Sequence, residues 1–206
     1  RDKLVTGVQT CALPICLWGD YIEAGSWAVV AAVTGGEIDV HGARPEDLEV
    51  VEAVLRRMDV QCRSVGDVFR VEQSRAQGAG RIVTGLWPGF PSDLVSLVTV
   101  LATQAEGNTL VHDWMYELRL FALEQLSGMR ADLFLCDPHR IIVTGRRQLR
   151  GRILDSRDLR SGMALIAAAL AADGESRVAP LETVERGYGT LVERLRKLGA
   201  QVEKID

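Results

Sequence analysis

The feature of this sequence that most limits its fold is an apolar segment that occurs three times. The copies end in the similar strings AVTGGEIDV, TQAEGNTLV and AADGESRV, which place Gly36, Gly107 and Gly174 at matching positions. These glycines are 71 and 67 residues apart. Self-similarity at such a period indicates one structural unit built three times.

Each apolar segment predicts a helix that lacks a polar face, whereas a helix on the surface would carry one. The three predicted helices span residues 25–33, 93–105 and 159–171. Because all three need cover, we expect them to be enclosed by the rest of the chain. A glycine follows each of them, as is common at helix C-termini.

The residues after each enclosed helix predict the remaining elements of the unit. A short strand comes first, followed by a second, amphipathic helix at residues 45–58, 115–129 and 187–198. Alternating segments such as RADLFLC and RIIVTG then predict a strand pair. The unit is therefore βαβαββ, and the sequence predicts a pseudo-threefold α+β domain whose third copy is cut short after Val202.

Composition excludes several classes of protein. Of the 206 residues, 47% are hydrophobic and 25% are charged, as in ordinary soluble domains. No apolar run approaches the roughly 20 residues that cross a bilayer, and the net charge of −4 argues against a nucleic-acid partner. The cysteines form no CxxC pair, so we expect reduced thiols, a cytoplasmic protein and no metal site.

The first residues differ in character from the rest. The string VTGVQTCALPI at residues 5–15 resembles the translation of a common sequencing-library adapter. We therefore expect residues 1–16 to be adapter-derived and to belong to no repeat. The native part is then 17–206, with units at about 17–74, 80–145 and 150–206.

Four short segments carry a more specific likeness: IEAGSW at 22–27, WPGFPSDL at 87–94, DLR at 158–160 and ERGY at 185–188. In these segments, and over most of 21–202, the chain resembles the enolpyruvyl transferases. The resemblance implies an inside-out α/β prism of pseudo-threefold βαβαββ repeats around enclosed apolar helices. Leu159 follows Asp158 where the shikimate-pathway branch would have His, which favours the branch acting on UDP-N-acetylglucosamine.

The resemblance also implies an activity. Enzymes of that branch transfer enolpyruvyl from phosphoenolpyruvate to the 3′-hydroxyl of UDP-N-acetylglucosamine, the first committed step of peptidoglycan and cell-wall synthesis. No cofactor is implied, since phosphoenolpyruvate is a co-substrate, and neither is a nucleic-acid or membrane partner. The family places a phosphate-binding lysine and a cysteine or aspartate acid in an N-terminal half, which we expect to be missing here, so this part alone should be inactive.

Two carboxylates are the candidate catalytic residues. Asp93 matches the family aspartate that holds the sugar hydroxyl and is proposed as its base, a role that needs a positioned carboxylate. Asp158 matches an aspartate near the methylene carbon, where a proton is gained and then lost. The alternative for Asp93 is a capping role, since Ser92 and Asp93 precede a predicted helix.

Four further residues are candidates for substrate binding. Arg119, Arg160 and Arg186 match family arginines, and fixed cations suit the phosphate and carboxylate of phosphoenolpyruvate. Each could instead be an ordinary surface arginine. Met115 falls where a backbone contact to the uridine nucleotide is expected.

The chain departs from the family around Arg119. Leu118 stands where the family has Asn, and Leu120, Phe121 and Ala122 replace a Phe-Met-His string. Altered substrate preference, a non-catalytic nucleotide-sugar-binding relative and the shikimate-pathway transferase therefore stay open as alternatives. For a working site, Asp93, Asp158, Arg119, Arg160 and Arg186 must converge on one end of the prism.

Overall fold

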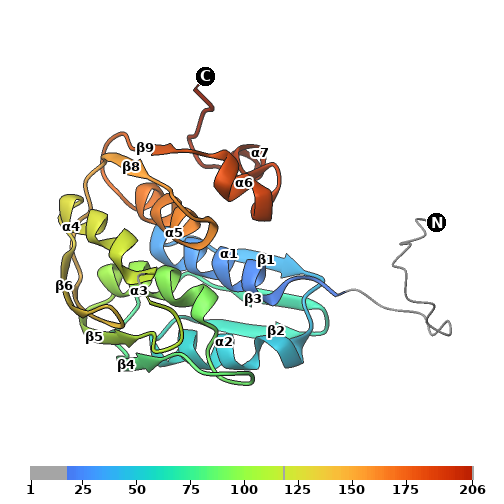
Figure 1. The fold of residues 1–206 in the computed structure, drawn as a ribbon. Helices are drawn as coiled ribbons and strands as arrows, with labels where there is room; N and C mark the ends of the chain where they lie inside the picture. Colours follow the sequence, from blue (N-terminus) through green and yellow to red (C-terminus); the bar gives the residue numbers. More distant parts are fainter. Residues whose placement is uncertain (1–17, 118, 206) are drawn as a thin grey trace, which may run out of the picture.

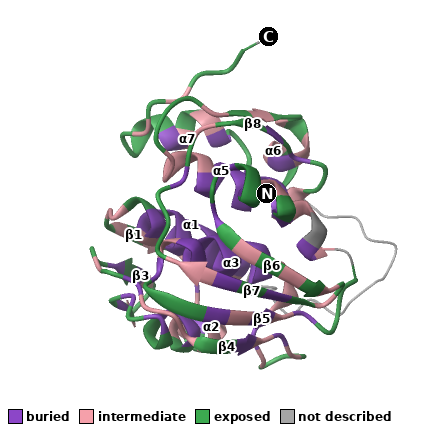
Figure 2. Cartoon of the chain, turned by 90° about the vertical axis from the view of Figure 1, so that its left-hand side faces the viewer, coloured by how far each residue is buried: buried purple, intermediate pink, exposed green. Residues whose placement is uncertain are grey.

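Three helices lie side by side at the centre of the computed structural model, which describes residues 18–117 and 119–205. They are α1 (Tyr21–Thr34), α3 (Val95–Gln104) and α5 (Leu159–Leu170), and they contact one another. The sheets and the remaining helices surround these three (Figure 1), and most residues of the three central helices are buried (Figure 2). The predicted α+β fold with enclosed helices is confirmed. The expectation for residues 1–16 lies outside the described residues.

Three small sheets form the outer layer. The first has order β1-β3-β2 and is antiparallel; its strands are β1 (Ile38–His41), β2 (Cys62–Val65) and β3 (Val68–Val71). The second has order β4-β5-β7-β6; its strands are β4 (Gly80–Val83), β5 (Gly107–His112), β6 (Asp132–Asp137) and β7 (Arg140–Gly145). The third pairs β8 (Ile153–Asp155) with β9 (Arg177–Ala179) in parallel, as β4 pairs with β5.

The second helix of the middle unit is shorter than predicted. The helix α2 (Pro45–Arg57) matches its prediction, but the helix expected at 115–129 is replaced by η2 (Arg119–Glu124) and α4 (Gln125–Gly128). The N–H of Met115 donates instead to the carboxylate of Asp113, at 3.2 Å. This side-chain bond competes with a helical one, as short acidic residues do in turns.

The second helix of the third unit is also different from the prediction. Instead of one helix at 187–198 there are two, α6 (Glu182–Tyr188) and α7 (Leu191–Lys197). Gly189 between them has φ 62° and ψ −139°, a conformation that ends α6 and that glycine adopts without strain. Arg186 consequently lies in the last turn of a helix, not at the start of one.

The second helices of all three units end in the same backbone motif. The residue after the helix cap has a positive φ in each: 57° at Asp59, 73° at Arg130 and 92° at Gly199. The following N–H then reaches back to a carbonyl five residues earlier, for example from Ala131 to Leu126 at 2.9 Å. This left-handed ending satisfies carbonyls that the helix leaves free.

Several hydroxyl groups inside the central helices bond within their own helix, whereas those of Ser96 and Ser161 are buried without a partner in the described residues. Ser26 donates to the carbonyl of Ile22 at 2.7 Å, and Thr99 donates to that of Val95 at 2.8 Å. Contacts between the three helices are therefore mainly apolar. None of the helices in the described part of the chain is both long and apolar enough to cross a membrane.

Candidate active site

Asp93 lies in the short helix η1 (Ser92–Leu94), directly before α3. Its carboxylate caps neither helix. One oxygen accepts from Arg119 Nη1 at 2.9 Å, and the other lies 3.2 Å from Arg160 Nη2. The capping alternative is therefore wrong for this side chain, which is held between two guanidinium groups.

Asp113 fixes the loops that carry this cluster, although the sequence did not single it out. It is fully buried directly after β5. Its carboxylate accepts from the hydroxyls of Ser92 at 2.6 Å and Thr84 at 3.0 Å, and from the N–H of Met115 at 3.2 Å. The loop before η1 and the loop before η2 are thus bound to the same carboxylate.

The two arginines are held from different sides. The side chain of Arg119 is 11% exposed, and its guanidinium lies 4.5 Å from the ring centre of Tyr116. Arg160, 20% exposed, is in the first turn of α5 and donates to the Tyr188 hydroxyl at 3.4 Å. Burial lowers the pKa of Arg160, but Tyr188 and Asp93 outweigh it and raise that pKa above its ordinary value. The guanidinium therefore stays charged.

Tyr188 connects this site to the core. It is buried, and its hydroxyl lies 2.9 Å from Ser26 Oγ in α1. Since Arg160 donates to Tyr188 and Ser26 donates to Ile22, Tyr188 must donate to Ser26. Burial raises the pKa of Tyr188, which keeps that donor protonated. The sequence contained a signal, because Tyr188 belongs to the ERGY segment.

The other predicted residues lie around this cluster without joining it. Asp158 caps α5, accepting from the N–H groups of Arg160 at 3.0 Å and Ser161 at 2.9 Å. Arg186 is exposed on α6 and makes no hydrogen bond or ion pair within the described residues. Met115 is exposed, and its N–H is already bonded to Asp113. The structure thus brings Asp93, Arg119 and Arg160 together, with Asp158 close by along the chain.

Exposed aromatic rings form a rim beside the cluster. Trp87 contacts Tyr21 edge-on with ring centres 5.7 Å apart, and Trp114 donates its indole N–H to the carbonyl of Thr84 at 2.7 Å. Trp87, Trp114 and Tyr116 are all exposed. Burial, followed by the charge of Asp93, raises the pKa of Tyr21. Flat exposed rings of this kind suit a ligand with its own apolar faces.

The three central helices all begin at this end of the molecule. Tyr21 starts α1, Asp93 precedes α3 and Arg160 lies at the start of α5. Helix N-termini carry partial positive charge, which adds to that of the two arginines. The arrangement can therefore attract an anion while presenting one carboxylate as a proton acceptor.

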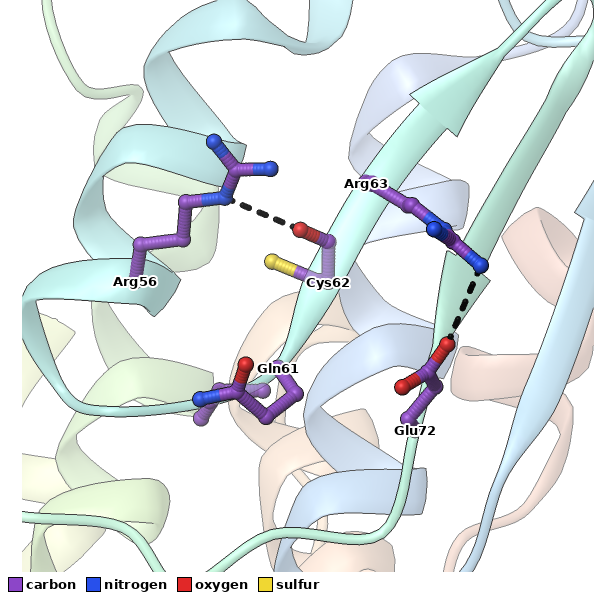
Figure 3. Close-up of a pocket in the computed structure, with 6 residues that line it drawn as sticks. Arg56, Gln61, Cys62, Arg63 and Glu72 are labelled. Carbon is purple, nitrogen blue, oxygen red and sulfur yellow. Dashed lines mark hydrogen bonds and ion pairs between the residues drawn. The ribbon is translucent and has the colours of Figure 1, made fainter.

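A separate hollow of about 360 Å³ beside β2 is not part of this site. It is lined by Arg56, Cys62 and Glu72 among others (Figure 3). Burial raises the pKa of Cys62 to about 12, so its thiol is protonated and unreactive at neutral pH. Within 18–117 and 119–205, no three His, Cys, Asp or Glu side chains are grouped to hold a metal ion.

Comparison with known proteins places the chain in a family. Residues 2–204 match the family model described as EPSP synthase (3-phosphoshikimate 1-carboxyvinyltransferase). Relatives called UDP-N-acetylglucosamine 1-carboxyvinyltransferase are similar: the one from Borreliella burgdorferi is 37% identical over 195 residues, and the one from Treponema denticola is 38% identical over 192 residues. These matches cover 90% and 89% of this chain but only 45% of each relative, so the chain spans about half of their length.

Solved structures show the same fold. The enolpyruvyl transferase NikO from Streptomyces tendae superposes with a TM-score of 0.81 at 25% identity, covering 92% of this chain and 45% of that one. EPSP synthase from Acinetobacter baumannii superposes with a TM-score of 0.72 at 22% identity, covering 92% and 48%. Both matches thus cover a little under half of the solved chain, as the sequence matches do for the relatives.

Proposed function

The chain belongs to the EPSP synthase (3-phosphoshikimate 1-carboxyvinyltransferase) family, and from this premise we propose that it forms one wall of an enolpyruvyl transferase site. The proposed reaction joins C2 of phosphoenolpyruvate to the 3′-oxygen of UDP-N-acetylglucosamine and releases phosphate. The relatives at 36–38% identity are called UDP-N-acetylglucosamine 1-carboxyvinyltransferase, which favours the nucleotide sugar over shikimate 3-phosphate as acceptor. The observation that carries the proposal is the carboxylate of Asp93 between Arg119 and Arg160.

Each member of this cluster has a role in the proposal. Asp93 accepts the proton that the sugar hydroxyl loses as its oxygen attacks C2. Arg119 and Arg160 hold the anionic groups of phosphoenolpyruvate through charge-assisted hydrogen bonds. Asp158 lies two residues from Arg160 and takes part in the gain and loss of the proton at C3. Loss of the phosphate restores the double bond in the product.

Arg186 and Met115 have weaker support. Arg186 is exposed and lies two residues before Tyr188, so its side chain is available to a ligand that approaches from outside. Met115 has already committed its N–H to Asp113, which leaves its carbonyl as the group that could contact a nucleotide. We propose both as secondary binding residues.

The proposed site needs the other half of the protein opposite this wall in order to catalyse the reaction. With one wall, a bound phosphate faces bulk solvent, where a single ion pair contributes only about 0–1 kcal/mol. Closing a cleft expels water and completes the set of donors. We therefore propose that residues 1–206 alone have no turnover, and that the soluble, cytoplasmic whole requires the other half of the chain.

A chimera tests this proposal. Residues 18–206 replace the matched part of the Treponema denticola relative, and phosphate release from phosphoenolpyruvate is measured with UDP-N-acetylglucosamine. We expect turnover in the chimera and none in the isolated chain. Asp93→Asn should lower the rate by about 10²–10⁴-fold, the usual contribution of a general base. The matched control is Asp39→Asn, which breaks the Asp39–Arg70 pair on β1 and β3.

Three outcomes would contradict the proposal. A chimera that folds but is inactive would favour the non-catalytic relative. Turnover with shikimate 3-phosphate instead of the nucleotide sugar would favour the other branch. Turnover by the isolated chain would refute the need for a second wall.

A further inference from the structure

Three carboxylates precede the three central helices, and one of them differs from the other two. Asp20 precedes α1 and accepts from the N–H of Ile22 at 2.8 Å. Asp158 precedes α5 and accepts from two N–H groups of its first turn. Asp93 accepts from no backbone N–H in the described part of the chain and contacts only two guanidinium groups. It is therefore the one carboxylate of the three that can change its contacts without uncapping a helix.

The backbone around Asp93 is held in place by hydrogen bonds. The neighbouring Ser92 donates its hydroxyl to the buried carboxylate of Asp113 at 2.6 Å. The N–H of Leu94 donates to the carbonyl of Pro91 at 3.1 Å, and α3 follows directly. The side chain of Asp93 itself is 40% exposed. A change in its contacts therefore needs rotation of one side chain and no movement of the loop.

The two arginines have more donors than the described residues use. Arg119 and Arg160 are 11% and 20% exposed, so both are more buried than the carboxylate between them. A guanidinium group has five N–H donors. The Arg119 guanidinium bonds to Asp93, and the Arg160 guanidinium contacts Asp93 and Tyr188. The remaining donors are available to a further anion.

Two roles in the proposed reaction compete for these contacts. A general base needs an oxygen within reach of the proton that it takes. In the observed structure one oxygen of Asp93 accepts from Arg119 at 2.9 Å, and the other lies 3.2 Å from Arg160. The same arginines are proposed to hold the anionic groups of phosphoenolpyruvate. The carboxylate of Asp93 and the anionic groups of the ligand are thus alternative partners for the same donors.

We propose that Asp93 occupies the anion site of Arg119 and Arg160 in the ligand-free chain and is displaced when phosphoenolpyruvate binds. The phosphate or carboxylate of the ligand takes the guanidinium N–H groups. The side chain of Asp93 rotates away from them, which leaves an oxygen free to accept the proton of the sugar hydroxyl. Binding of the donor substrate thereby frees the base. The identity of the ligand rests on the proposed function, whereas the exchange of anions can be tested without turnover.

Competition from an internal anion lowers the affinity for an external one. The apparent dissociation constant is the intrinsic one divided by the fraction of molecules in which the site is free. Two partly exposed ion pairs of ordinary strength leave the site free in about 3–20% of molecules. Removal of the Asp93 carboxylate should therefore tighten anion binding by about five- to thirtyfold.

Titration of residues 1–206 with inorganic phosphate and with phosphoenolpyruvate measures this effect. Binding is followed by the ¹⁵N NMR signals of the arginine side chains at constant ionic strength, because salt screens exposed charges. We expect Asp93→Asn and Asp93→Ala each to lower the dissociation constants of both anions by about five- to thirtyfold. The gain should be lost when Arg119→Gln is added. The melting temperature of each variant checks that it is folded.

Asp20→Asn is the matched control. Asn caps a helix as well as Asp does, so this change removes one negative charge at the same end of the molecule and keeps the cap of α1. The pKa of Arg160, which burial lowers, is raised by Tyr188, then by Asp93 and only then by Asp20. We therefore expect Asp20→Asn to tighten anion binding by no more than about twofold.

Four results would overturn the exchange. They are an equal gain in Asp20→Asn and Asp93→Asn, which net charge would explain, unchanged binding in both Asp93 variants, undetectable binding in all of the proteins, and a gain that survives Arg119→Gln. The chimera tests the proposed function separately. An inactive chimera whose Asp93→Asn form binds phosphate more tightly would refute the proposed function alone. An active chimera whose Asp93→Asn form binds phosphate no more tightly would refute the exchange alone.

Discussion

A chain of donors runs from the charged site into the core. Arg160 donates to Tyr188, Tyr188 to Ser26, and Ser26 to the carbonyl of Ile22. The guanidinium that contacts Asp93 is thereby oriented from behind by a buried hydroxyl on another helix. The position of Arg160 therefore depends on the buried residues Tyr188 and Ser26 behind it.

Tyr188→Phe should destabilise the chain by about 1 kcal/mol, the typical net value of one hydrogen bond. Ser26→Ala should cost a similar amount, and the double variant should cost less than the sum, because both changes remove the same bond. Urea unfolding of the four proteins measures this. Additive effects would mean that the two hydroxyls do not interact.

The two cysteines in the described residues should react very differently with iodoacetamide. Cys136 is exposed and should be alkylated quickly at pH 8, whereas the buried Cys62 should be alkylated only in urea. Because the folded pKa of Cys62 is raised from 9.0 to about 12, its protonated form adds stability below pH 9, and that stability is lost between pH 9 and pH 12. Peptide mapping checks the labelling, and Cys62→Ser should abolish this part of the alkaline loss.

The residues of the candidate site were only partly predictable. Asp93, Arg119 and Arg160 were found through family motifs, and the structure brings them into contact. Asp113 was missed because a buried positioning residue leaves no local pattern, and Tyr188 was given no role although it lies in the ERGY segment. Their partners lie up to 162 residues away in the sequence.

At the scale of elements, the central helices were predictable because they lack a polar face. A helix that is apolar on every side has few alternatives to burial. The second helices were less predictable, because local bonds decided their outcome. The carboxylate of Asp113 takes the N–H of Met115, and Gly189 breaks the last helix in two.

The repeated helix ending leads to a test of backbone strain. Arg130 and Gly199 occupy equivalent left-handed positions, with φ 73° and 92°. Arg130→Gly should stabilise the chain by about 0.5–1 kcal/mol, since a side chain is disfavoured in that conformation. Gly199→Ala should destabilise it by a similar amount. Thermal unfolding measures both, and a destabilising Arg130→Gly would show that its side chain contributes more than the strain costs.

At the scale of the whole molecule, the three units share one core, because α1, α3 and α5 all contact one another. We therefore expect a single cooperative transition, with equal calorimetric and van't Hoff enthalpies. Deleting residues 149–206 removes α5 and exposes the apolar faces of α1 and α3. The shortened chain should show no cooperative unfolding by calorimetry. A shortened chain that still melts sharply would mean that each unit folds separately.

The overall architecture was predictable from the repeat, but the arrangement of the loops around the ends of the central helices was not. Three matched apolar segments suffice to place three helices together. Which loops then meet depends on single side chains, such as Asp113 between the loops before η1 and η2. The unit boundaries near 74 and 145 stay predictions.

The hydroxyls of the central helices have a consequence for how far such sequences can diverge. Ser26, Thr99 and Thr103 each donate to a carbonyl of their own helix, and in the described residues no hydrogen bond joins α1, α3 and α5. Apolar contacts tolerate exchange of side chains if total volume is kept. We therefore expect the side chains of the central helices to be exchangeable while the backbone stays the same, in keeping with the shared fold at 22–25% identity.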